Sequence, residues 1–212
     1  MQLLLASASP RRAELLAAAG FRFEVAPVEI DERLLPDEAP EAYVARLART
    51  KARVAATRYP DRVVLAADTA VIAEDDEVLG KPGDDRQAAG MLARLAGRLH
   101  TVMTGVTIRA GVREATTVER TLVAFLPMTA DEIAWYVATG EGRDKAGGYG
   151  IQGLASRFVD RIEGSYGSVV GLPIPAVCRL LREVGAGDLL ARPPAEAGPS
   201  GGVGKPTTAD KC

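Results

Sequence analysis

Residues 63–73 read Val-Val-Leu-Ala-Ala-Asp-Thr-Ala-Val-Ile-Ala and form the strongest strand signal in the chain. A continuous apolar run of this kind is typical of a strand that is covered on both faces. Asp68 interrupts the run, where an unpaired carboxylate would be expensive to bury. We therefore expect that a cation or a metal ion neutralises Asp68, or that the strand opens there into a solvated cleft. A hydrogen bond from a neighbouring loop is the simpler alternative.

Strands and helices alternate on both sides of this segment. Strands are expected at 3–6, 21–30, 78–79, 101–110, 114–126 and 157–162, and helices at 10–19, 40–57, 84–95, 129–140 and 174–184. Pro10 follows Ser9 as a helix start, and Thr129 with Glu132 has the spacing of a capping box. The interleaving predicts an α/β fold with a mixed sheet.

The composition is that of an ordinary globular protein. The chain has 212 residues, 47% of them hydrophobic and 25% charged, with a net charge of −2. Without a global basic field we expect no general nucleic-acid binding. The start lacks a signal-peptide pattern and no apolar run approaches a membrane span, so we expect a cytoplasmic protein with no membrane contact. Residues 189–212 are rich in Pro, Gly, Ala, Ser and Thr and predict a disordered tail beyond a folded domain at 1–188.

Two residue types that often carry chemistry are scarce. Cys178 and Cys212 have no partner at metal-ligand spacing, and we expect a buried structural cysteine and a tail cysteine. His100 is the single histidine, which leaves no Ser-His-Asp arrangement to pursue, and we expect a structural histidine whose hydrogen bonds are satisfied. The chain also lacks the Gly-Lys-Thr/Ser loop of P-loop proteins.

The turn at residues 7–12, Ser-Ala-Ser-Pro-Arg-Arg, combines several anion-binding features. A helix that begins there offers unpaired N–H groups and the positive end of its dipole. Ser7 and Ser9 add hydroxyl donors, and Arg11 and Arg12 add guanidinium groups suited to phosphate oxygens. The alternative is an ordinary capped helix with two solvated arginines. Because the turn follows a buried strand, we favour phosphate binding.

Further charged residues fit the same interpretation. Lys51 falls on the apolar stripe of the helix at 40–57, where it either extends its amine to solvent or holds it in a cleft near Asp68 or a phosphate. Lys81 lies in a short turn between Gly80 and Pro82. Asp31 and Glu32 end an extended segment and could supply metal-ligating oxygens. Together with Asp68 these residues suit phosphoryl-bond hydrolysis.

Several motifs in order resemble the Maf family of nucleoside triphosphate pyrophosphatases. They are Leu-Ala-Ser-Ala-Ser-Pro-Arg-Arg (5–12), Ala-Ala-Asp-Thr (66–69), Gly-Lys-Pro (80–82), Asp-Lys-Ala-Gly-Gly-Tyr-Gly-Ile-Gln-Gly (144–153) and Gly-Ser-Tyr-Gly-Ser-Val-Val-Gly-Leu-Pro (164–173). The resemblance implies an elongated mixed α/β fold with two lobes around a deep cleft, related to inosine triphosphatase. It also implies hydrolysis between the α and β phosphates with a divalent cation, Mg²⁺, Mn²⁺ or Co²⁺.

The resemblance also assigns roles to residues at matching positions. Asp68 would be the general base, and Asp68 and Glu32 would be the metal ligands. The expected substrate-binding residues are Ser7, Arg11, Glu32, Lys51, Thr69, Lys81 and Gln152, with Thr69 and Gln152 selecting the base. Members that share Ala-Asp-Thr and Ile-Gln-Gly are dTTP/UTP pyrophosphatases, and a homodimer is plausible by the same resemblance. A glutamine amide can match the N3–H and carbonyl edge of uracil or thymine.

Two other functions stay open at the level of sequence. The first is a pyrophosphatase for modified purine nucleotides, such as 7-methyl-GTP or inosine triphosphate. The second is a regulator of septum formation that binds nucleotide or a division protein without turnover. No motif for such a partner is recognisable in the chain. We therefore expect a dTTP/UTP pyrophosphatase whose partner is a small nucleoside triphosphate.

Overall fold

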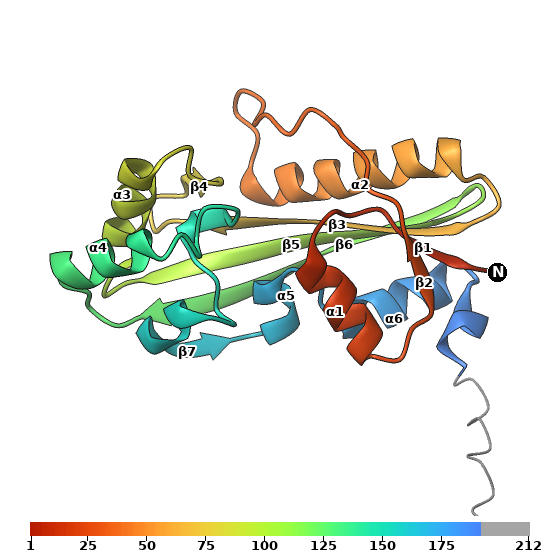
Figure 1. The fold of residues 1–212 in the computed structure, drawn as a ribbon. Coiled ribbons are helices and arrows are strands. Elements are labelled where there is room, and N and C mark those ends of the chain that lie inside the picture. Colours follow the sequence, from red (N-terminus) through yellow and green to blue (C-terminus); the bar gives the residue numbers. More distant parts are fainter. Residues whose placement is uncertain (192–212) are drawn as a thin grey trace, which may run out of the picture.

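The centre of the fold is a mixed sheet that runs the length of the molecule (Figure 1). In the computed structural model, which describes residues 1–191, seven strands form this sheet in the order β2-β1-β3-β5-β6-β7, with β4 also paired to β3. The strands are β1 (Leu3–Leu5), β2 (Phe23–Val25), β3 (Val63–Ile72), β4 (Val78–Leu79), β5 (Leu99–Ala110), β6 (Arg113–Phe125) and β7 (Val159–Glu163). β1 pairs in parallel with β2 and β3, and the other pairs are antiparallel.

Helices cover both faces and one end of this sheet. They are α1 (Pro10–Ala18), α2 (Pro40–Arg58), α3 (Asp85–Leu95), α4 (Ala130–Ala138), α5 (Tyr166–Val170) and α6 (Ile174–Glu183), with 3₁₀ turns at Ala146–Gly148, Leu154–Phe158 and Gly187–Leu190. α2 lies along one face, α1, α5 and α6 lie on the other, and α3 and α4 cover the end away from β1 (Figure 1). In this described part of the chain no helix is both long and apolar enough to cross a bilayer.

Alternate residues of β3 pack against different layers, as the two-residue period of a strand requires. Val64 and Ala66 face α2 in one buried cluster, while Leu65 and Ala67 face α1 and α6 in another. A further cluster joins the far end of the long strands to α3 and α4 through residues such as Leu92. The first two clusters form the core of one lobe and the third cluster forms the core of the other. The long strands connect the two lobes. The expected α/β class, with a mixed sheet flanked by helices, is confirmed.

The backbone of α2 packs closely on the sheet over Gly105 of β5. A Cβ atom at Gly105 would overlap the backbone carbonyl of Val44. Gly105 is also the register partner of Asp68 on β3, so both residues face α2. Because Gly105 has no side chain, α2 can pack close to the sheet, and this closeness determines the distance from Lys51 on α2 to Asp68.

Most expected element boundaries agree with the structure, and a few do not. The extended segment predicted at 21–30 forms a strand only over Phe23–Val25, because its partner β1 has three residues. α5 lies in a segment with no predicted helix. Ser9 occupies the N-cap position of α1, although its side chain makes no capping bond. Cys178 is half-buried rather than buried.

The last described residues of the chain pack against the body of the protein. Leu189 and Leu190 pack against the core shared by α1 and α6, whereas the predicted domain ends at residue 188. The rest of the predicted tail, from residue 192, and Cys212 with it, lies outside the described residues.

Candidate active site

The site begins at a gap in the pairing of β3. On one side of β3, β1 pairs with residues 63–65 and β4 pairs with residues 71 and 72. Within the described residues no strand pairs with that edge between them, so residues 66–70 have no strand neighbour on that side. Asp68 and Thr69 lie in this gap, on opposite faces of β3. Both side chains consequently reach the same cleft, although a regular strand directs them apart.

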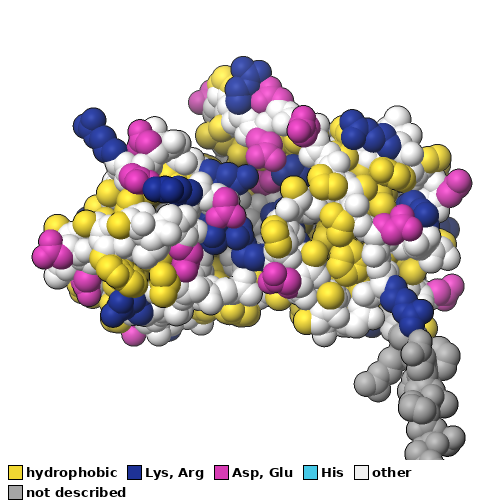
Figure 2. All heavy atoms as spheres, in the orientation of Figure 1, with side chains coloured by type: hydrophobic (Ala, Val, Ile, Leu, Met, Phe, Trp, Pro, Cys, Tyr) yellow, Lys and Arg dark blue, Asp and Glu magenta, His cyan; other side chains and the backbone are white. Residues whose placement is uncertain are grey.

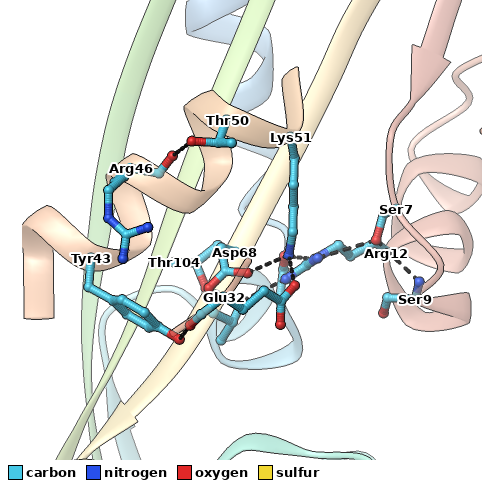
Figure 3. A network of polar contacts seen from close by, with 12 residues as sticks. Ser7, Ser9, Arg12, Glu32, Tyr43, Arg46, Thr50, Lys51, Asp68 and Thr104 are labelled. Carbon is cyan, nitrogen blue, oxygen red and sulfur yellow. Dashed lines mark hydrogen bonds and ion pairs between the residues drawn. The ribbon is translucent and has the colours of Figure 1, made fainter. Parts of the chain in front are cut away.

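Lys51 joins the two carboxylates of the site (Figure 3). Its Nζ lies 2.7 Å from Oδ1 of Asp68 and 2.6 Å from Oε1 of Glu32. The side chains of Lys51 and Asp68 are each only 11% exposed, whereas that of Glu32 is 48% exposed. A charge this deeply buried requires a partner. Lys51 therefore supplies the cation that the position of Asp68 in an apolar strand predicts.

Glu32 occupies the loop between β2 and α2. The hydroxyl of Tyr43 donates a hydrogen bond of 2.9 Å to the backbone carbonyl of Glu32 and so fastens the loop to α2. Burial by itself would raise the pKa of the Glu32 carboxyl. The hydrogen bond and charge of Lys51, with the charges of Lys81 and Arg12, outweigh burial and hold that pKa below its usual value. Glu32 is therefore an anion at neutral pH.

Arg12 connects three segments of the chain. Its guanidinium donates to Oγ of Ser7 at 3.2 Å, to Oγ1 of Thr69 at 3.1 Å and to the carbonyl of Gly171 at 2.9 Å. Burial lowers the pKa of Arg12, and the charge of Asp68 opposes this effect. With these donors engaged by protein acceptors, Arg12 acts mainly as a structural clamp on the cleft wall.

Arg11 has a different environment from its neighbour. Its Nη1 forms one ion pair, at 3.3 Å, with Oδ2 of Asp144 across the cleft, and its side chain remains 28% exposed. Asp144 also pairs with Lys145 at 2.6 Å. Most of the Arg11 guanidinium donors are thus available to a ligand. This geometry favours Arg11 over Arg12 as a phosphate contact, which stays a prediction.

The segments around the far wall of the cleft are tied to each other. The amide of Gly147 donates to the carbonyl of Gly80 at 3.0 Å, which fixes the Gly-rich segment, residues 140–153, beside the turn that carries Lys81. Gly147 has φ +69°, and a Cβ there would press on Val71. Lys81 and Gln152 both border the cleft. The close packing against Val71 explains why residue 147 of this segment is a glycine.

All of the expected site residues line one cleft of about 660 Å³. They are Ser7, Arg11, Glu32, Lys51, Asp68, Thr69, Lys81 and Gln152. Lysine and arginine side chains gather in the hollow between the two lobes (Figure 2). Other residues also line it without having been predicted as site residues: Tyr43, Glu141, Asp144, Lys145 and Tyr149. Several of these belong to the Gly-rich segment, whose composition was the available signal.

His100 is buried behind this wall. Its Nε2 lies 2.8 Å from the hydroxyl of Tyr149, and its ring packs edge-on against Phe125. His100 therefore has the expected structural role, but the expectation that all of its hydrogen bonds are satisfied is wrong. Nδ1 has no hydrogen-bond partner within the described part of the chain.

The fold and the cleft together define a class: an α/β protein with a cationic cleft that suits a polyphosphate and two carboxylates at its floor. The chain matches the family model for Maf-like proteins over residues 2–184. It therefore belongs to the Maf family.

Individual relatives agree with this assignment. A dTTP/UTP pyrophosphatase of Symbiobacterium thermophilum is 49% identical over 184 residues, covering 87% of this chain and 94% of the relative. One of Myxococcus xanthus is 52% identical over 183 residues, covering 86% and 92%. The solved structure of the Staphylococcus aureus Ham1 protein has a TM-score of 0.40 at 16% identity, covering 59% of this chain and 71% of that one. The last likeness is too weak to carry an argument.

Proposed function

We propose that this protein hydrolyses dTTP and UTP to the nucleoside monophosphate and pyrophosphate. The observation that carries the proposal is the Asp68–Lys51–Glu32 arrangement at the floor of a cleft that also holds Arg11 and Lys81. Membership of the Maf family and the names of the two relatives, each about half identical, support the same activity.

Asp68 is the candidate general base. Its carboxylate lies in the open gap of β3 and can accept a proton from a water molecule that attacks phosphorus. The ammonium of Lys51, at 2.7 Å, holds the carboxylate in place and compensates its charge. Water adds to the α-phosphorus while the bond from that phosphorus to the bridging oxygen breaks, and pyrophosphate leaves with that oxygen. Arg11 and Lys81 would stabilise the charge on the phosphates.

A divalent cation fits the acidic residues of this cleft. Within residues 1–191, no three or more His, Cys, Asp and Glu side chains are grouped to hold a metal ion by themselves. Mg²⁺ commonly binds through one or two carboxylates together with substrate phosphates and water. Asp68 and Glu32 provide such a pair, and Mn²⁺ or Co²⁺ would use the same oxygens. When bound, the ion would neutralise phosphate charge and polarise the phosphoryl group.

Thr69 can contribute to base selection because its hydrogen bonds have a fixed direction. The hydroxyl of Thr104 donates to the carbonyl of Ser168 at 2.8 Å, so Thr104 must accept from Thr69. Thr69 also accepts from Arg12. Its oxygen can therefore offer a ligand only an acceptor. An acceptor suits the N3–H of uracil or thymine and not the unprotonated N3 of cytosine, and Gln152 would read the rest of that edge.

The direct test is product identification with the purified full chain and Mg²⁺. We expect pyrophosphate from dTTP and UTP, with slower turnover of CTP and of 7-methyl-GTP. Asp68→Asn should reduce kcat by at least about 10²-fold, the lower range for loss of a positioned base. Asp160→Asn, at an exposed aspartate of β7, is the matched control and should leave kcat unchanged. Orthophosphate as the first product would contradict the proposal.

A further inference from the structure

The carboxylate of Glu141 holds the chain segment that carries Gln152. Glu141 lies just beyond the end of α4, after a turn in which Gly140 has φ +72°. Its Oε2 accepts a hydrogen bond from the amide of Leu154 at 2.8 Å, and its Oε1 accepts one from the amide of Ala155 at 3.3 Å. The Gln152 segment is thereby attached to the end of α4 on its C-terminal side.

Tyr136 of α4 attaches the same segment on its N-terminal side. Its hydroxyl donates to Oε1 of Glu141 at 2.8 Å and accepts from the amide of Gly150 at 3.2 Å. The residue is 1% exposed and belongs to the core of its lobe. Burial, followed by the hydrogen bond to Glu141, raises the pKa of Tyr136, so the hydroxyl stays protonated and keeps donating. Gln152 thus lies between two anchored points.

The contact between Glu141 and the segment is closely packed. A Cβ atom at Gly153 would overlap Oε2 of Glu141. The carboxylate receives three donors: two backbone amides and the Tyr136 hydroxyl. A group that only accepts hydrogen bonds serves all three, whereas a glutamine amide at this position would direct its NH₂ at one of them. The arrangement therefore depends on the carboxylate and not only on the length of the side chain.

We propose that Glu141 is a positioning residue for base selection, acting through Gln152. The proposal rests on the proposed function, in which Gln152 reads the pyrimidine edge. Glu141 borders the cleft, but its carboxylate is occupied by the segment and does not need to touch the substrate. Its effect should consequently appear in discrimination between bases more than in the chemical step.

The test uses Glu141→Gln, with Glu183→Gln at an exposed glutamate of α6 as the matched control. The first measurement is hydrogen exchange of the amides in residues 150–155 of the free protein, which we expect to accelerate by about ten-fold once the carboxylate is lost. The second is the ratio of kcat/KM for UTP to that for CTP, which should fall by about ten-fold, mostly through KM for UTP. The control should change neither.

A double-mutant cycle separates positioning from a general structural effect. If Glu141 acts through Gln152, then Glu141→Gln added to Gln152→Ala should change the UTP-to-CTP ratio by less than about two-fold. Tyr136→Phe, which removes only one hydroxyl, should shift the exchange and the ratio in the same direction by smaller factors. This variant keeps the test decisive if Glu141→Gln folds poorly.

Several results would overturn the inference. They are unchanged exchange at 150–155, an equal loss of kcat/KM for UTP and CTP, or additive effects of the Glu141 and Gln152 substitutions. Failure of the proposed function looks different. If the wild-type protein released no pyrophosphate from any nucleotide, base selection by Glu141 would fall with it, while the exchange measurement would still decide whether Glu141 anchors the segment.

Discussion

Gly105 of β5 lies opposite Asp68 of β3 in the sheet register, and the space its missing side chain leaves is filled by the backbone of α2. The depth at which α2 sits on the sheet, and with it the reach of Lys51 to Asp68, depends on this glycine. Gly105→Ala should push α2 outward and lengthen the Lys51–Asp68 contact. We expect a loss of about 1–3 kcal/mol in the free energy of unfolding, as for other overpacked sites, together with reduced kcat.

Urea unfolding and pyrophosphate release measure the two effects of Gly105→Ala. Gly90→Ala is the control, because Gly90 lies on the exposed side of α3 and a Cβ atom there would meet nothing within 4 Å. That change should be neutral or stabilise the helix by about 0.5–1 kcal/mol. If Gly105→Ala were as well tolerated as Gly90→Ala, the close approach of α2 would not matter to the site.

Lys51 should determine the ionisation of Glu32. In the wild-type protein the folded-state pKa of Glu32 lies below its ordinary value of 4.5. The resulting stabilisation is present above that value and is lost as the pH falls through the lower folded-state pKa. Lys51→Met removes the compensating cation but keeps the burial, so the pKa of Glu32 should rise and the acid limb of the pH–kcat/KM profile should move to higher pH.

The same substitution should also destabilise the fold, because it leaves Asp68 buried without its partner. Loss of one partner of a buried pair typically costs about 3–5 kcal/mol. Arg49→Met, at an exposed position of the same helix, should leave both stability and the pH profile unchanged. An unshifted acid limb in Lys51→Met would show that Glu32 and Lys51 are not coupled in solution.

Arg12→Lys tests whether Arg12 is a structural clamp. A single ammonium cannot reproduce the planar fork that donates to Ser7, Thr69 and Gly171. We expect a loss of about 2 kcal/mol in the free energy of unfolding, from acceptors left without a donor. Arg11→Lys, by contrast, should change stability by less than about 1 kcal/mol because its ion pair is largely solvated. Equal destabilisation by the two changes, measured in urea, would refute the distinction between them.

Asp68 shows how much of the site could be predicted from the sequence. A carboxylate in an apolar strand required a cation or an opening. The structure has both, since Lys51 pairs with Asp68 and no strand of residues 1–191 pairs with that edge of β3 beside it. Lys51 itself was recognisable because it interrupts an apolar stripe. Periodicity of 2 and 3.6 residues likewise identified the long strands and helices, whose amphipathic pattern extends over many residues.

Contacts between distant segments could not be predicted in this way. Arg12 meets Thr69 and Gly171, which lie 57 and 159 residues away, and no local pattern records such an approach. The short helix α5 was also missed, because five residues make little more than one turn and show no period. Glu141 carried no signal of its own, since two of its three partners are backbone amides, which no residue pattern records.

His100 should make the stability of the protein depend on pH. Burial lowers the pKa of His100 from its ordinary value of 6.5 to about 4. The unfolded chain therefore binds a proton as the pH falls below 6.5, while the folded protein does not. The stabilisation is complete above pH 6.5 and declines toward pH 4, and at pH 5 the loss should be about 2 kcal/mol in the free energy of unfolding.

His100→Gln isolates this effect, because an amide can still bond to the hydroxyl of Tyr149 but does not titrate. Urea unfolding at pH 7.5 and 5.0 should show the loss in the wild-type protein and a smaller loss in the variant, with other groups cancelling in the comparison. Since His100 is the single histidine of the chain, its ring proton resonance can be followed without ambiguity through an acid titration. A midpoint near the ordinary histidine pKa, or equal pH dependence of the two proteins, would mean that the ring is not held neutral by burial.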